Sequence, residues 1–140
     1  MAQLNFSNET PFNSPPPEKN SVPILSELSD CYKLWHGYLV NLPRHTKFTL
    51  GTKLDHLFVE LLELTLAASY ASRDKKIEII QNLSAKFDAL KFLLKILWEI
   101  GGLNNQKYSL LSQKLKLIGQ QIGGWQNYCK NKPPLSAREN

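Results

Sequence analysis

Basic side chains are the residues of this sequence whose number and spacing indicate a binding function. Among its 140 residues, 17 Lys and Arg stand against 12 Asp and Glu, which gives a formal net charge of +5. The excess lies in the second half, because residues 102–131 contain four lysines and no acid. Clustered cations neutralise phosphates and release condensed counterions, which gives salt-sensitive and largely sequence-independent binding of nucleic acid. The charge distribution therefore favours a polyanionic partner.

The candidate contact residues are cations that helical spacing can group. Lys91 and Lys95 are four residues apart, so they share one face of a helix. In an antiparallel layout, the same end of the bundle holds Lys95, Lys107 and three earlier cations, Arg44, Lys47 and Lys53. We predict nucleic-acid contact by nine residues, namely Arg44, Lys47, Lys53, Lys86, Lys91, Lys95, Lys107, Lys114 and Lys116.

Motifs of common catalytic and metal sites are missing from the sequence. No histidine follows a glutamate at the Glu-x-x-His spacing that di-metal sites of helix bundles use. There is no GxxxxGK[ST] or GxGxxG phosphate loop and no GxSxG nucleophile elbow. The two cysteines form no CxxC pair, which argues against a zinc site. We therefore expect a protein that is not an enzyme and that uses no cofactor or metal.

Four segments have apolar residues at intervals of three and four, the spacing that places side chains on one face of a helix. The four stripes are Leu28, Cys31, Trp35, Tyr38 and Leu42; Leu50, Leu54, Leu57, Leu61, Leu64 and Ala68; Ile80, Phe87, Leu90, Leu94 and Leu97; and Tyr108, Leu111, Leu115, Ile118, Ile122, Trp125 and Cys129. No strand pattern competes with them. The two cysteines on these stripes are expected to be small buried apolar residues.

Helix-breaking and capping residues separate the segments. Pro43 lacks an N–H and is expected to end the first helix. Ser72 can open the third helix, and Gly101-Gly102 can close it in a left-handed conformation. Asn104 or Asn105 can cap the fourth helix. Because connections this short make neighbouring helices antiparallel, we predict an all-α, up-down-up-down four-helix bundle over residues 24–131.

The two ends of the chain differ from this helical region. Residues 10–17 carry four of the eight prolines, and the segment 1–23 has too few aliphatic residues to order itself. We predict disordered tails at residues 1–23 and 132–140. Since no apolar run of eighteen residues and no evident signal peptide exist, we expect a cytoplasmic protein without a membrane span.

The second and third helical segments are more apolar than one core-facing stripe requires. The surplus residues, which we predict to form an oligomer interface, are Phe58, Leu62, Phe92, Ile96 and Ile100. Leaving several such side chains exposed in one patch promotes association. We therefore predict a homo-oligomer, and the alternative is a wide monomeric core.

Three glycines lie inside the fourth helical segment, at positions 119, 123 and 124. Glycine in a helix interior costs about 1 kcal/mol relative to alanine. Such a cost persists where a backbone or a ring must approach closely, so we expect tight packing here, with Trp125 as an anchor.

Residues 35–55, WHGYLVNLPRHTKFTLGTKLD, resemble the first helix, the turn and the second helix of the accessory variability determinant (Avd) proteins of diversity-generating retroelements. Residues 90–95, LKFLLK, with Trp98-Glu99, are similar to the third helix of that family, and Ile118-Gly119 with Gly123-Gly124-Trp125 to the fourth. The resemblance covers about residues 30–128 in the right order.

This resemblance implies a pentameric ring of four-helix bundles that binds nucleic acid and the element's reverse transcriptase. It implies a role in making mutated cDNA from a template RNA, in which adenines are miscopied, and in the transfer of that cDNA to a target gene. Lys91 and Lys95 match paired basic positions of the family, and Arg44, Lys47 and Lys53 match its basic turn. Gln120 departs from the family, which often carries a basic residue there.

Two alternatives remain open at this stage. Four-helix-bundle proteins encoded in intervening sequences of bacterial rRNA genes share this fold, and a neighbouring reverse transcriptase gene would favour the retroelement group. A pure protein-interaction module would instead present its basic faces to acidic protein surfaces. A salt titration separates the two partner classes, since nucleic-acid binding weakens steeply and linearly on a log-log plot.

Overall fold

Four long helices make up the fold. The computed structural model describes residues 21–131, and it contains α1 (Ser21–Leu39), α3 (Thr52–Tyr70), α4 (Arg73–Glu99) and α5 (Asn105–Asn131). A short helix, α2 (Arg44–Thr46), and a π-helical turn, η4 (Lys47–Gly51), lead into α3. No strand occurs within residues 21–131, so the predicted all-helical class is confirmed.

The boundaries of the helical region differ slightly from the expected ones. The helix α1 begins at Ser21, three residues before the predicted start at residue 24. Pro23 lies in the first turn of α1, where its missing N–H leaves no intrahelical bond unmade. The rest of the two predicted tails, residues 1–20 and 132–140, lies outside the described residues.

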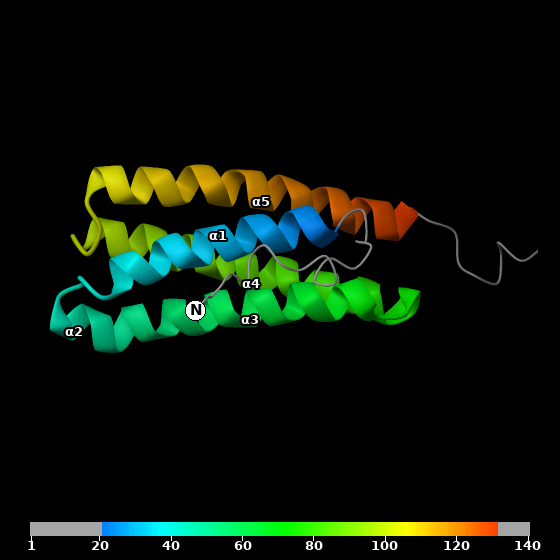
Figure 1. The fold of residues 1–140 in the computed structure, drawn as a ribbon, viewed down its shortest axis with the longest axis horizontal. Helices are drawn as coiled ribbons and strands as arrows, with labels where there is room; N and C mark the ends of the chain where they lie inside the picture. Colours follow the sequence, from blue (N-terminus) through cyan, green and yellow to red (C-terminus); the bar gives the residue numbers. More distant parts are fainter. Residues whose placement is uncertain (1–20, 132–140) are drawn as a thin grey trace, which may run out of the picture.

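The long helices lie side by side as a four-helix bundle (Figure 1). Each of α1 and α4 packs against both α3 and α5. The connection that leaves α1 lies at the same end of the molecule as the connection from α4 to α5, and the connection from α3 to α4 lies at the opposite end (Figure 1).

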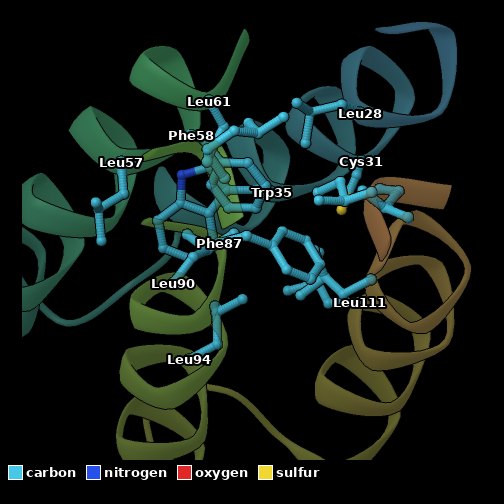
Figure 2. Packing of buried hydrophobic residues seen from close by; sticks show 14 of the residues in the cluster. Leu28, Cys31, Trp35, Leu57, Phe58, Leu61, Phe87, Leu90, Leu94 and Leu111 are labelled. Atoms are coloured by element: carbon cyan, nitrogen blue, oxygen red, sulfur yellow. The ribbon is translucent and has the colours of Figure 1, made fainter. Parts of the chain in front are cut away.

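The apolar stripes converge on one continuous core. Figure 2 shows Trp35 of α1, Phe58 and Leu61 of α3, and Phe87 and Leu90 of α4 lying together. Every stripe residue expected from the 3–4 spacing is buried or half-buried, which confirms the core positions. The half-buried ones lie toward the ends of the stripes and are Tyr38, Leu50, Leu64 and Tyr108.

One predicted interface residue belongs to this core instead. Phe58 is fully buried, and its ring centroid lies 5.7 Å from that of Trp35 and 5.8 Å from that of Tyr32. The expectation that Phe58 faces outward is therefore wrong. Since α3 packs between α1 and α4, it buries an arc wide enough for both Leu57 and Phe58.

The other four predicted interface residues divide into two groups. Leu62 and Ile96 are half-buried, and Leu62 packs against the core. Phe92 and Ile100 are each 61% exposed. Of the five predicted interface residues, only Phe92 and Ile100 are therefore largely exposed.

The first helix ends before the proline that was expected to end it. The last residue of α1 is Leu39, and a turn follows in which the Leu42 N–H donates to the Leu39 carbonyl over 3.2 Å. Pro43 disfavours the helical conformation in the residue before it, so the helix stops earlier. Pro43 itself precedes α2, and its carbonyl accepts the Lys47 N–H at 2.8 Å.

The connection between α4 and α5 follows the expected capping chemistry. Gly101 has a φ of +87°, its N–H donates to the Trp98 carbonyl, and the Gly102 N–H donates to the Leu97 carbonyl, as in a Schellman motif. Asn104 caps α5, because its Oδ1 accepts the Lys107 N–H at 2.8 Å. Ser72 precedes α4, but its side chain makes no capping bond.

The glycines of α5 have unequal surroundings. A Cβ at position 119 would lie 3.0 Å from Cε2 of Phe87, which confirms the expected close approach of a ring. A Cβ at Gly123 or Gly124 would meet nothing within 4 Å, so the same expectation is wrong there. Trp125, Cys31 and Cys129 are buried, as expected.

Candidate nucleic-acid interface

The nine predicted contact residues lie in several places around the bundle. Two of them stand in the turn before α3, where Arg44 and Lys47 follow Pro43. The Arg44 guanidinium lies over the exposed Phe48 ring at 5.9 Å from its centroid. Lys47 donates from Nζ to the Val40 carbonyl at 3.3 Å, so this lysine also holds the turn against the end of α1.

The start of α5 brings another cation to this end of the bundle. The Lys107 Nζ lies 5.2 Å from the ring centroid of Tyr38, near the end of α1. A cation over an aromatic face is attracted by the negative face of the ring. Burial raises the pKa of Tyr38 further above neutral pH, where an ordinary phenol is already uncharged. Arg44, Lys47 and Lys107 therefore share one end, as the sequence predicted.

Lys86 lies in the middle of α4, and Lys53 lies at the start of α3. Lys86 forms an ion pair with Glu60 of α3, with 3.6 Å between Nζ and Oε1, so its charge is partly compensated. Lys53 is exposed in the first turn of α3, so it lies at the same end as Arg44 and Lys47, as the sequence predicted.

The two mid-helix lysines of α5 point in different directions. Lys114 is half-buried near α1, where its charge acts on the Cys31 thiol. Burial raises the pKa of Cys31 to about 12, although the Lys114 charge acts to lower it. Lys116 is exposed and faces the groove between α4 and α5. The two residues therefore do not belong to one cluster.

The α4–α5 groove contains a cavity of about 190 Å³, which we call the α4–α5 cavity. It is lined by two lysines, two leucines and two hydroxyl side chains, namely Lys91, Lys116, Leu94, Leu115, Tyr108 and Ser112. The Lys91 Nζ lies 5.2 Å from the Phe87 ring centroid and 3.9 Å from Oδ1 of Asp88. Lys95 is exposed one turn beyond Lys91 on α4. The cavity thus joins predicted cations from two helices.

Tyr108 and Ser112 were missed as candidate site residues. Tyr108 was assigned only to the apolar stripe, and Ser112 lay between two stripe positions. Their common position on the α4 side of α5, four residues apart, was the only signal that could have found them.

The Tyr108 ring is held firmly in place. It stacks on the Trp98 indole, with 4.8 Å between the centroids and an interplanar angle of 7°. The indole Nε1 of Trp98 in turn donates to Oδ1 of Asn105 at 2.8 Å. The aromatic pair therefore gives the cavity a rigid edge at the end of the bundle where α4 turns into α5.

Residues 21–131 contain neither a metal-binding cluster nor a membrane-spanning helix. This part of the chain holds no group of three or more His, Cys, Asp or Glu side chains placed to bind a metal ion. Within the same residues, no helix combines the length and the apolar character that crossing a membrane requires.

Of the comparisons with known proteins, one gives a match, to a protein family. No curated protein and no solved structure matches the chain. A family model described as bAvd-like matches residues 24–129, which span all four long helices of the bundle. The chain therefore belongs to the bAvd-like family.

Proposed function

We propose that this protein is a non-catalytic accessory protein of a diversity-generating retroelement that binds nucleic acid and the element's reverse transcriptase. The observation that carries the proposal is membership of the bAvd-like family over residues 24–129. The basic α5, which has no acidic residue from Asn105 to Asn131, and the lysines of the α4–α5 cavity support it.

In this proposal the bundle positions template RNA and cDNA near the polymerase. Lys and Arg contacts to phosphates fix the position of a strand but carry no sequence information. Specificity for the template then comes from the reverse transcriptase or from RNA structure. The protein itself supplies binding without a cofactor, and it supports mutagenic reverse transcription and the return of cDNA to a target gene.

The proposed working form is a homopentameric ring of antiparallel, up-down-up-down bundles in the cytoplasm. Exposed apolar residues on two helices support self-association. On α3 they include Val59, Leu66 and Tyr70, which we call the α3 stripe, and on α5 they include Leu110 and Leu117, which we call the α5 stripe. The intervals of seven and four residues keep each stripe on one helix face.

A ring can form when two different surfaces of the protomer, here the α3 stripe and the α5 stripe, contact each other. When the α3 stripe of one copy meets the α5 stripe of the next, the contact is heterologous, and a ring forms if the rotation closes. Phe92 and Ile100, both exposed on the α4 side, stay in the predicted interface. Phe58 leaves it because that residue fills the core of its own bundle.

Charge reversal tests the nucleic-acid part of the proposal. Lys91→Glu with Lys95→Glu is expected to leave the helical content unchanged, since both side chains are exposed, and to weaken RNA binding at low salt. The matched control is Lys75→Glu with Lys130→Glu, which reverses two exposed charges outside the candidate site. Fluorescence anisotropy with a labelled RNA measures both.

The salt dependence provides the second measurement. The log of the wild-type affinity should fall linearly with the log of the salt concentration, and the slope should shrink in the Lys91/Lys95 variant. Equal affinities of the two double variants at low salt would contradict the proposal. If the wild type does not bind RNA but binds an acidic protein, the protein-interaction alternative is favoured. Co-purification with the element's reverse transcriptase tests the proposed protein partner.

A further inference from the structure

We propose that the α4–α5 cavity takes one unpaired nucleotide of a single strand, with its base in the cavity and its flanking phosphates at Lys91 and Lys116. This inference rests on the proposed nucleic-acid function and adds a preference that phosphate contacts alone cannot supply. Duplex and single strand both present phosphates, but only an unpaired base is available to enter a cavity.

The size and lining of the cavity fit one planar group. Its volume of about 190 Å³ is below the roughly 300 Å³ of pockets for drug-sized ligands. Leu94 of α4 and Leu115 of α5 provide apolar walls, and Ser112 adds a hydroxyl that can donate to or accept from a base edge. An apolar site with a few polar groups is the usual composition of a small-ligand pocket.

The aromatic edge of the cavity is ordered before any ligand arrives. Tyr108 lines the cavity while its ring stacks on Trp98, and Asn105 holds the indole by its N–H. A ring that is already fixed loses little conformational entropy when a base packs against it. Proteins that bind single strands combine such aromatic platforms with cations along the backbone.

The cations lie where the phosphates on either side of a bound base would pass. Lys91 reaches the cavity from α4 and Lys116 reaches it from α5. The Asp88 carboxylate lies 3.9 Å from the Lys91 Nζ, and both side chains of this pair are at least half exposed. Such an exposed pair is weak, so a phosphate can compete for Lys91.

The test compares three labelled probes of equal length, of which the duplex carries twice the phosphates of either single strand and so has the larger charge. They are a single-stranded oligoadenylate, the same strand with abasic positions, and a duplex of equal length. The wild type should bind the abasic strand and the duplex about tenfold more weakly than the intact strand, a loss in the range that base–aromatic stacking contributes. A 2-aminopurine base in the intact strand should lose fluorescence on binding because it packs against Tyr108.

A variant that fills the cavity distinguishes binding by base insertion from binding by charge alone. Ser112→Phe occupies the cavity and keeps both lysines, so it should abolish the preference for the intact strand while duplex binding persists. Ser109→Phe, on the exposed face of the same helix, is the matched control and should keep the preference. Tyr108→Leu removes the ring without adding bulk, and it tests the same point if Ser112→Phe does not fold.

The outcomes distinguish this inference from the function on which it rests. If the wild type binds all three probes equally, nucleic-acid binding stands and base insertion is overturned. If it binds none of them at low salt, the proposed function itself fails. If polyglutamate displaces the intact strand as well as unlabelled oligoadenylate does, the cavity recognises charge alone and the inference is also overturned.

Discussion

The indole of Trp35 stacks on the phenyl ring of Phe58, with 5.7 Å between the centroids and an angle of 22° between the planes. The same indole donates its Nε1–H to Oδ1 of Asp55 at 3.2 Å. Both contacts join α1 to α3, and together they satisfy the apolar face and the polar N–H of a buried tryptophan. This relationship fixes the interface between the two helices and assigns Phe58 to the core.

Phe58→Ala should therefore destabilise the fold strongly. Truncating a buried phenylalanine removes its transfer free energy and leaves a cavity, and the usual loss is about 3–5 kcal/mol. The matched control is Phe48→Ala, because Phe48 is 66% exposed and should lose under about 1 kcal/mol. Urea unfolding at one fixed protein concentration measures both. A small loss for Phe58→Ala would indicate that the side chain does not fill the core.

Gly101 and Gly37 form a second matched pair. A Cβ at either position would meet nothing within 4 Å, but only Gly101 has a positive φ, of +87°. Gly101→Ala should cost about 1–2 kcal/mol because an L side chain is strained in this region. Gly37→Ala, inside α1, should instead stabilise by about 0.5–1 kcal/mol. Thermal unfolding checks the opposite signs, and a stabilising Gly101→Ala would contradict the Schellman geometry.

Burial of Cys31 makes the stability fall at alkaline pH. Burial raises the pKa of this thiol from 9.0 to about 12, with Lys114 acting to lower it and Glu27 acting to raise it. Above pH 9 the unfolded thiol loses its proton while the folded thiol keeps it, so the unfolded state gains stability as pH rises toward 12. Cys31→Ala should flatten this decline.

Urea unfolding at steps between these two pH values measures the effect. Burial also raises the pKa of Tyr32 and of Tyr38, so the Cys31→Ala variant should retain part of the decline. Parallel pH curves for the wild type and the variant would show that Cys31 contributes nothing to it.

Local chemistry made much of the fold predictable. The 3–4 spacing depends only on the geometry of one helix, so the stripe positions on all four helices followed from the sequence. The turn at Gly101 and the cap at Asn104 likewise need only neighbouring backbone groups. These predictions were correct because each feature depends on residues that are close in sequence.

Features that depend on neighbouring helices could not be predicted. The burial of Phe58 beside Leu57 follows from the two partners of α3, and a single stripe does not contain that information. The cavity shared by Lys91 and Lys116 depends on the rotation of α4 and α5 about their own axes. The empty space around Gly123 likewise depends on how the neighbouring helices pack against α5.

Leu66→Glu and Leu117→Glu test the proposed heterologous contact. Leu66 of the α3 stripe is 48% exposed and Leu117 of the α5 stripe is 53% exposed, so each variant should fold. A buried, unpaired charge disfavours the contact, so each variant alone should be monomeric by light scattering at the chain mass of 16.0 kDa. An equal mixture should form dimers and stop there, because each copy retains one intact stripe that fits the intact stripe of the other. If Leu117→Glu alone still dimerises, the contact does not need the α5 stripe, and the proposed heterologous contact is wrong.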